Sequence, residues 1–328
     1  GNGKGCLSWE LKTGVTSRMK PRAWVALIAV YIVWGSTYLA IRFAIETIPP
    51  FLSAGIRFLV SGAILYFWRR LSGDPAPKKV EWRSASIIGL LLLLGGNGGL
   101  VWAEQRIPSG IASLFIATTP LWMVLIDSLR PNGQRANGLT WLGVLVGLTG
   151  TALLANPWQS HTASPPLDPI GIVVLLVAAL SWSIGSLYSR KASLPSSPLM
   201  GTGMEMLVGS LGLFAFGTLI GEWNQFHLTT ISLRSLGGLA YLIVFGSGIG
   251  FVAYTWLLRN APTPLVSTYA YVNPVVAIFL GSVVVHETLE GIEIISALII
   301  ISGVILITTS KSLLARKPSP IPLTPGED

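Results

Sequence analysis

Two stretches of the sequence decide the fold: WGSTYLAIRFAIETIPPFLSAGIRFLVSG at residues 34–62, and WSIGSLYSRKASLPSSPLMGTGMEMLVGS at residues 182–210. They align without a gap and share tryptophan, arginine, proline and glycine in register. The identical pairs are Trp34/Trp182, Leu39/Leu187, Arg42/Arg190, Ala44/Ala192, Pro50/Pro198, Gly55/Gly203, Leu59/Leu207 and Val60/Val208. Leucine and valine matches arise by chance between apolar helices, whereas paired tryptophan, arginine and proline indicate a duplicated unit.

The duplication continues further along each half. A second alignment, with a shift of 154 residues, matches Gly96/Gly250, Trp102/Trp256, Pro108/Pro262, Ser113/Ser267 and Pro120/Pro274. The two halves of the chain therefore present the same segments in the same order.

The composition indicates a membrane protein. Of 328 residues, 51% are apolar and 11% are charged, and the mean hydropathy is +0.65. Soluble domains carry roughly 25% charged residues, so this chain has too few charges to cover a water-exposed surface. These values exclude a soluble globule, a disordered chain and a nucleic-acid-binding protein.

Ten apolar runs are long enough to cross a bilayer, whose core of about 30 Å needs about 20 helical residues. The predicted spans are 23–45, 51–68, 85–104, 109–128, 139–155, 169–189, 199–220, 235–257, 264–285 and 290–310. The runs do not alternate between polar and apolar residues, which excludes a β-barrel and leaves helices as the spanning structure.

We therefore predict an all-α polytopic membrane protein with ten transmembrane helices. Spans 1–5 match spans 6–10, and because five is odd the second unit enters the membrane from the opposite face. Such an inverted repeat is typical of many secondary transporters. The predicted divisions are an N-terminal tail at 1–22, a first repeat at 23–155, a linker at 156–168, a second repeat at 169–310 and a C-terminal tail at 311–328.

The basic residues predict the orientation. With ten spans both termini lie on one side, and 18 of the 22 lysine and arginine residues fall in segments on that side. Lysine and arginine are enriched in cytoplasmic connections. Both tails are therefore predicted to be cytoplasmic, and the linker at 156–168 external.

Several short strings together resemble the EamA family of the drug/metabolite transporter superfamily. They are WGSTY (34–38), RFL (57–59), GNG (96–98), AE (103–104), PSGIA (108–112), EML (205–207) and YAYVNPVVA (269–277). The resemblance covers roughly residues 19–312 and implies two inverted five-helix EamA repeats. It further implies a multi-pass protein of the bacterial inner membrane that exports small metabolites such as amino acids.

Two prolines lie near the middle of spans 4 and 9, where each removes a helical hydrogen bond and frees a carbonyl. These prolines are Pro120 and Pro274, and their polar neighbours are Thr118, Thr119, Tyr269 and Asn273. Tyr269 and Asn273 are spaced i, i+4 and share a helix face. We expect all six residues to line a central substrate cavity. The alternative is a kink in a packed helix.

A second group of candidates lies deep in spans 1, 3 and 6. Trp34 and Trp182 are too deep for the interfacial aromatic belt, so they form either gates and walls of the cavity or core packing. Thr37 and Ser186 offer hydroxyl groups nearby. Asn97 lies between glycines, and its amide either contacts substrate or joins helices.

Charged residues within spans are costly and are candidates for function. Arg57 either holds a substrate carboxylate or extends toward the interface. Glu205 aligns with Arg57 but lies nearer the other face, so no direct salt bridge between them is expected. Glu205 and Glu104 are the candidates for carrying a coupling proton.

The remaining acidic and basic residues have simpler interpretations. Arg42 and Arg190 are expected to be interfacial anchors. The acidic residues Glu287, Glu290 and Glu293 are expected to form a solvated edge.

The sequence favours a secondary transporter. It contains no G-x-x-x-x-G-K-[ST] motif, so an ion gradient or the substrate's own gradient has to supply the driving force. One cysteine, Cys6, and three separated histidines give no metal-ligand spacing, and no metal or cofactor is expected. The expected partners are a small-molecule substrate, membrane lipids and a coupling proton, with no nucleic acid and no obligatory protein.

Two other functions remain as alternatives. A channel or lipid scramblase shares the same architecture. An intramembrane enzyme would need paired carboxylates, a Ser-His dyad or a metal cluster within the spans, and the sequence contains no such pattern, so catalysis is not expected.

Overall fold

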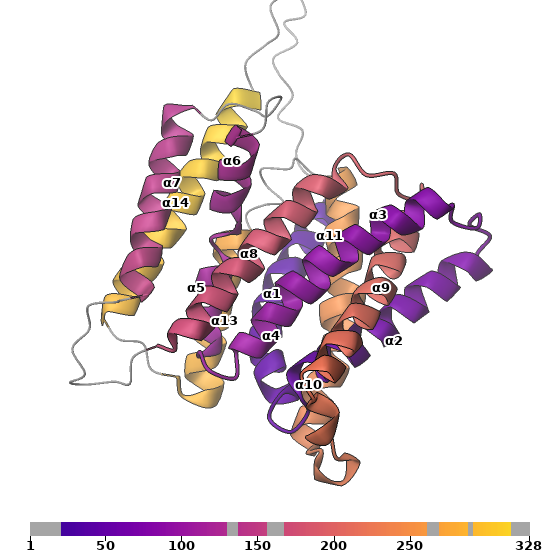
Figure 1. Ribbon diagram of the computed structural model, residues 1–328. Coiled ribbons are helices and arrows are strands. Elements are labelled where there is room, and N and C mark those ends of the chain that lie inside the picture. The colour runs from indigo at the N-terminus through magenta and orange to yellow at the C-terminus, as the bar shows by residue number, and fades with distance from the viewer. Residues whose placement is uncertain (1–20, 130–136, 156–166, 261–268, 288–290, 316–328) are drawn as a thin grey trace, which may run out of the picture.

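The computed structural model describes residues 21–129, 137–155, 167–260, 269–287 and 291–315, and these residues are mostly helical (Figure 1). The elements are α1 (Pro21–Ala44), α2 (Pro50–Leu71), α3 (Lys79–Gly89), η1 (Leu90–Gly98), α4 (Gly99–Ala103), α5 (Ser109–Ile116), α6 (Thr119–Leu129), α7 (Gly138–Ala155), α8 (Pro169–Ser189), α9 (Pro198–Leu219), η2 (Glu222–Asn224), η3 (Leu228–Thr230), α10 (Leu233–Tyr241), η4 (Leu242–Ile249), α11 (Gly250–Asn260), α13 (Tyr269–Val285) and α14 (Gly291–Ala315). No strand occurs among these residues. Each predicted span contains a helix, which confirms the all-α fold.

Some helix boundaries differ from the prediction. Span 3 begins at Lys79 rather than at 85, because the Glu81 carboxylate accepts the backbone amide of Lys78 and caps the helix. α14 continues to Ala315, so residues 311–315 of the predicted tail are helical. The predicted start of span 9, at 264, lies outside the described residues.

The helices are long and apolar enough for a bilayer. Among the described residues seven helical segments satisfy both conditions, and three shorter apolar helices are Gly138–Leu154, Val272–Val285 and Gly291–Ile307. Large apolar side chains stay exposed on the outside of the bundle, among them Val25, Ile64, Phe67 and Leu298. This many exposed large apolar side chains fit contact with lipid better than contact with water.

Helix contacts repeat between the two halves of the chain. α2 packs along α9, and α7 packs along α14, so each pair joins equivalent helices (Figure 1). α1 lies against α13 and against α10, η4 and α11. α8 lies in the same way against α5 and α6 and against α3, η1 and α4. Exchanging the halves leaves these neighbours unchanged, as a two-fold axis between inverted repeats requires.

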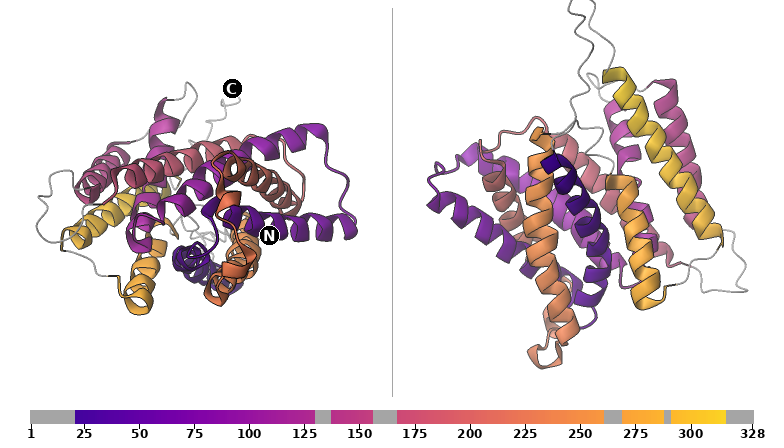
Figure 2. Two further views of the ribbon diagram at one scale, coloured as in Figure 1. Left: turned by 60° about the horizontal axis from the view of Figure 1, so that its bottom comes forward. Right: turned by 180° about the vertical axis from the view of Figure 1, so that it is seen from behind.

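Glycines bring α7 and α14 into close contact, and Figure 2 shows these two helices side by side from behind. A Cβ atom at Gly303 would lie 2.6 Å from the amide nitrogen of Gly147 and 2.8 Å from the carbonyl oxygen of Gly143. The backbones therefore touch where small residues recur every fourth position.

Spans 3 and 8 contain matching irregular segments. Each helix widens into π-helical turns, at η1 and at η4 respectively. Such turns are rare and occur frequently at functional sites. The two repeats therefore carry the same backbone distortion in equivalent helices.

Polar contacts gather at one end of the bundle, which is the lower side in Figure 1 near α10. The Ser235 hydroxyl donates to the carbonyl oxygen of Phe43 at 2.8 Å. Glu222 accepts from the backbone amides of Phe51 and Leu52 at 3.1 and 2.9 Å and so caps α2. These residues lie at or beside connections predicted to be external, and we call this end the predicted outer face.

Candidate functional site

The π-helical segment η4 collects three of the predicted site residues. The Trp34 indole donates to the carbonyl oxygen of Gly246 at 3.2 Å, and Arg57 Nε donates to the Ser247 hydroxyl at 2.8 Å. A Cβ atom at Gly246 would lie 3.0 Å from Thr37 Cγ2 and 3.2 Å from an Arg57 terminal nitrogen. Glycine at this position therefore lets α1 and α2 both reach the η4 backbone.

Aromatic rings surround Trp34. Its ring centre lies 4.9 Å from that of Tyr254 and 5.3 Å from those of Phe251 and Tyr269. Tyr254 and Tyr269 are also in contact, with 5.7 Å between their ring centres. The structure thus joins the predicted residues Trp34 and Tyr269 in one cluster of helices α1, α11 and α13.

Asn273 lies one helical turn beyond Tyr269. Its residue is 6% exposed, and its side-chain oxygen has no hydrogen-bond partner among the described residues. A Cβ atom at Gly35 would lie 3.2 Å from the Asn273 carbonyl oxygen, so α1 passes directly over this part of α13. A buried amide oxygen without a donor is costly in apolar surroundings, and it is available to a ligand.

The two mid-span prolines have different effects. Beside Pro120 the helix breaks, since α5 ends at Ile116 and α6 begins at Thr119. Pro274 lies inside a continuous α13. The proline therefore coincides with a helix break in the first repeat, whereas in the second repeat it lies within a helix.

The side chains of Thr118 and Thr119 form hydrogen bonds with carbonyl groups at the end of α5. Their hydroxyls donate to the carbonyl oxygens of Phe115 and Ile116, at 2.6 Å in each case. The carbonyl oxygen of Thr119 accepts the Ser183 hydroxyl of α8 at 3.0 Å. A hydrogen bond therefore joins the helix break of the first repeat to α8 of the second repeat.

Trp182 mirrors Trp34 in the other half of the molecule. Its ring carbon Cε3 would lie 2.9 Å from a Cβ atom at Gly96 of η1, as the Trp34 ring carbon Cδ1 would lie 2.8 Å from a Cβ atom at Gly250. Each repeat therefore places its tryptophan on a glycine beside or within the π-helical segment of the other half of the bundle.

The other candidates of this second group make local contacts. The Asn97 amide donates to the carbonyl oxygen of Leu92 in its own helix at 3.4 Å. The Ser186 side chain is half-buried, and its carbonyl oxygen accepts the hydroxyl of Ser189. Asn97 lies in η1 and Ser186 in the neighbouring helix α8. Neither residue is part of the cluster at Trp34.

The charged candidates lie apart from one another. Arg57 is 4% exposed and its guanidinium lies 4.7 Å from the ring centre of Phe58. Glu205 is half-buried on α9, and no ion pair joins it to Arg57 in the described part of the chain. Glu104 is 5% exposed, and neither carboxylate oxygen has a hydrogen-bond partner among the described residues.

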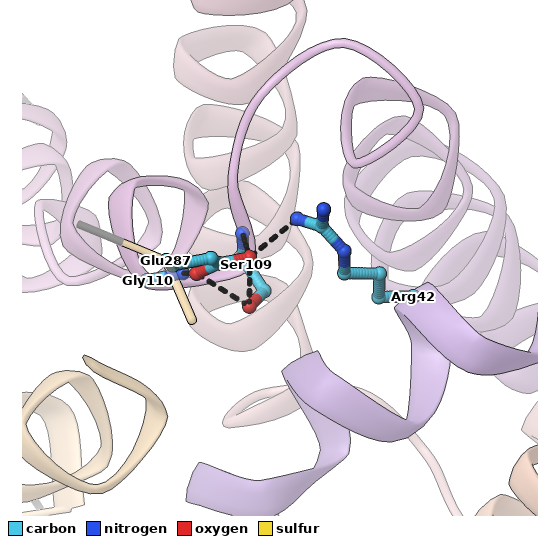
Figure 3. Close-up of polar contacts among 4 residues, drawn as sticks. All are labelled: Arg42, Ser109, Gly110 and Glu287. Atoms are coloured by element: carbon cyan, nitrogen blue, oxygen red, sulfur yellow. Dashed lines mark hydrogen bonds and ion pairs between the residues drawn. The ribbon is translucent and has the colours of Figure 1, made fainter. Parts of the chain in front are cut away.

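Glu287 corrects one interpretation. It does not form a solvated edge, because its side chain is 11% exposed and pairs with Arg42 (Figure 3). It also accepts the Ser109 amide at 3.2 Å, the Ser109 hydroxyl at 3.1 Å and the Gly110 amide at 3.3 Å. Glu287 therefore caps α5 and joins it to α1 at the predicted outer face. Glu290 lies outside the described residues.

Sequence reasoning missed several residues of this site. Tyr254, Phe251, Gly246 and Ser247 were not singled out as ligand-contacting, although Gly246 and Gly250 form a small-residue pair four apart. The signal that would have found them is the alignment of Gly250 with Gly96, which places span 8 opposite Trp34 in the same way that span 3 lies opposite Trp182.

The fold and these contacts define a class: a polytopic helical membrane protein whose two inverted repeats meet at polar and aromatic residues, the arrangement found in many secondary transporters. Within the described residues no group of three or more histidine, cysteine, aspartate or glutamate side chains forms a metal site.

Comparison with known proteins identifies the family. The EamA-like transporter family model matches residues 22–156 and 169–309, and the chain belongs to this family. It is 38% identical to the "Uncharacterized inner membrane transporter YedA" of Escherichia coli (strain K12), over 91% of this chain and 94% of that protein. It is 26% identical to "Protein PecM" of Dickeya dadantii (strain 3937), over 89% and 93% of the two chains. A crystal structure with 21% identity and a TM-score of 0.59, covering 90% of this chain and 97% of that one, has the same fold.

Proposed function

We propose that this protein is a secondary transporter, and not an enzyme, that moves small metabolites across the inner membrane of a bacterium by alternating access. Amino acids or related compounds are the proposed substrates, and export is the proposed direction. The observation that carries the proposal is a pair of equivalent contacts: Trp34 packs against Gly250, and Trp182 packs against Gly96. Two equivalent contacts between inverted repeats allow two equivalent conformations, each open to one side.

The residues around η4 supply the proposed binding site. Arg57 is a cation for a substrate carboxylate, Asn273 offers an unpaired amide oxygen, and Trp34 and Tyr269 form an aromatic wall. A ligand shifts the equilibrium between the two conformations only if it binds one of them more tightly. Contacts from α1, α2 and α13 to one ligand meet this condition, because these helices belong to different repeats.

Counterflow in proteoliposomes tests the proposal. Purified protein is reconstituted, loaded with an unlabelled amino-acid mixture and supplied with the same amino acids in labelled form outside. A carrier gives saturable uptake that rises when the inside is loaded. Flux that neither saturates nor responds to internal substrate would overturn the carrier mechanism and favour a channel, and movement of labelled lipid would favour a scramblase.

Labelling tests the proposed inversion and orientation separately. Single cysteines are introduced at residues 73–78 and at residues 157–166 in a chain without Cys6. Membrane-impermeant thiol reagents applied to intact cells should label only the second set, since that linker is proposed to be external. Labelling of both sets from one side would contradict five spans per repeat.

A further inference from the structure

A groove of about 760 Å³ lies between helices of the two repeats. α1 and α2 line it from the first repeat, and η4 and α11 line it from the second. α1 and α11 are in contact, and Figure 2 shows them side by side from behind. The volume is in the range of ligand pockets, about 300–1,000 Å³.

The wall of the groove is apolar and as long as one leaflet of a bilayer is thick. Val25 of α1, Ile64 of α2 and Val244 of η4 line it with exposed apolar side chains. Along η4 and α11 the lining continues from Val244 to Trp256, which is about 18 Å at the rise of a helix. One leaflet contributes about half of a bilayer core of about 30 Å. An acyl chain of a single leaflet therefore fits along the groove.

The mouth of the groove carries one cation and two tryptophans. Arg22, Trp68 and Trp256 line the groove within about one turn of a helix end, at the start of α1 and at the ends of α2 and α11. These helix ends are opposite the predicted outer face, so we call this side the predicted inner face. Tryptophan is enriched at the depth of lipid headgroups, so the mouth lies where a headgroup would be.

Arg22 is the cation that is left for a headgroup. It is exposed, and it belongs to none of the ion pairs in the described part of the chain. The neighbouring cations on α2 are engaged, since Arg69 pairs with Asp74 at 2.6 Å and Arg70 donates to the Asp74 carbonyl oxygen. No carboxylate is among the described residues that line the groove.

We propose that this groove binds one phospholipid of the inner leaflet whose headgroup has a net negative charge. The Arg22 guanidinium pairs with the phosphate, as arginine commonly does, and an acyl chain lies along Val25, Ile64 and Val244. A zwitterionic headgroup fits less well, because its ammonium group meets no carboxylate in the described lining. The inference goes beyond the transport function and does not depend on the substrate or on the direction of transport.

Photolabelling of the full-length chain tests this site. The protein is reconstituted in phosphatidylcholine nanodiscs with a small fraction of a probe lipid, which carries a diazirine near the end of one acyl chain. The two probes are phosphatidylglycerol and phosphatidylethanolamine with identical acyl chains, and mass spectrometry locates the modified residues. Phosphatidylglycerol should label the deep residues Ile64 and Val244 about fivefold more than phosphatidylethanolamine does, the effect of one basic residue near a membrane surface. Both probes should label Leu298 equally, since it is exposed on α14, which does not line the groove.

Variants at Arg22 identify the residue that selects the headgroup. Arg22→Gln should abolish the fivefold preference at Ile64 and Val244, and Arg22→Lys should keep most of it. Arg83→Gln is the matched control, because Arg83 is an exposed cation of α3 that does not line the groove, and it should retain the full preference. Melting temperatures equal to that of the parent confirm that the variants fold.

Three outcomes would overturn the proposal. Equal labelling of the groove by the two probes in the parent would mean that any lipid fills it. Labelling of Leu298 without labelling of Ile64 and Val244 would mean that something other than lipid covers the groove. A preference that survives in Arg22→Gln, or that is lost equally in Arg83→Gln, would assign the selection to the general positive charge of the surface.

Discussion

The indole nitrogen of Trp34 donates a hydrogen bond of 3.2 Å to the carbonyl oxygen of Gly246, across the boundary between the two repeats. The acceptor lies in the π-helical segment η4, where carbonyl groups are displaced from the usual helical pattern. Trp182 lies on Gly96 of η1 in the other half. When the repeats move relative to one another, both contacts have to break or shift. Substitutions at these glycines should therefore change the rate of transport.

A methyl group at Gly250 should disturb this contact. The new Cβ atom would lie 2.8 Å from Cδ1 of the Trp34 ring and still closer to its Nε1 nitrogen, and overpacking of this kind costs about 1–3 kcal/mol. Gly250→Ala should therefore lower both the melting temperature and the rate of counterflow. Gly248→Ala is the matched control, because its Cβ atom would meet nothing nearer than the Ile243 carbonyl oxygen at 3.4 Å. Equal melting temperatures and equal counterflow rates of the two variants would contradict a role for the contact between Trp34 and Gly250.

Asn273 should matter for transport and not for folding. Its side-chain oxygen has no hydrogen-bond partner among the described residues. Removing this oxygen in Asn273→Ala therefore leaves no hydrogen-bond donor of the described residues without its acceptor. We expect an unchanged melting temperature and counterflow reduced about tenfold, the loss typical of one hydrogen bond to a charged ligand group. Asn224→Ala is the control, because this residue is exposed at the end of η2. Unchanged transport kinetics in Asn273→Ala would remove this residue from the site.

The fold was predictable because it depends on features that a sequence carries directly. Apolar runs of bilayer length gave the helices, and the match of Trp34 with Trp182 gave the duplication. Helix ends were less predictable, since they depend on caps such as the Glu81 carboxylate at the start of α3. The π-helical segments were not predicted, because glycines four apart are equally typical of straight, closely packed helices.

The site was predictable only in part, because side-chain partners come from distant segments. The positions of Trp34, Arg57 and Tyr269 in their spans indicated depth but not neighbours. The partner of Arg57, Ser247, is 190 residues away and shows no pattern of its own. The sequence predicts a solvent-exposed Glu287, because this residue lies at the end of a predicted span. Its burial results from α5, whose first amide groups need an acceptor.

Glu205 provides a test of proton coupling. It is a half-buried carboxyl group within α9 and forms no ion pair in the described part of the chain. If it carries the coupled proton, Glu205→Gln should flatten the dependence of uptake on external pH while counterflow, which needs no net proton movement, continues. A pH profile identical to that of the parent would exclude Glu205 and leave Glu104 as the candidate.

The contacts of Glu287 should stabilise the fold unequally. Glu287→Ala leaves the Ser109 and Gly110 amides without an acceptor, which costs about 1–3 kcal/mol. Arg42 is 38% exposed, and Arg42→Ala removes one partly exposed ion pair worth about 0–1 kcal/mol. Unfolding in detergent with a double-mutant cycle should show that Arg42→Ala has almost no effect once Glu287 is replaced. Equal losses from the two single variants would contradict the capping role.

The Arg106–Asp168 pair should make stability depend on pH in the acid range. The Arg106 guanidinium donates a 3.0 Å hydrogen bond to Asp168 and holds the pKa of that carboxyl below its ordinary value. Because the folded state then binds its proton less tightly than the unfolded state, the stabilisation is fully present above the ordinary pKa, near 4, and is lost as pH falls below it. Melting temperatures measured from pH 3 to pH 7 should show this decline.

Asp168→Asn separates the ion pair from the helix cap. Asp168 is the N-cap of α8 and accepts the Ile170 amide at 3.2 Å, and asparagine caps a helix about as well as aspartate does. The variant should therefore melt lower than the parent at pH 7, and the difference should shrink as the pH falls and the parent carboxyl takes up its proton. Arg106→Gln should produce the same convergence from the other partner. Equal melting temperatures of Asp168→Asn and the parent across this range would show that Asp168 acts through the cap alone.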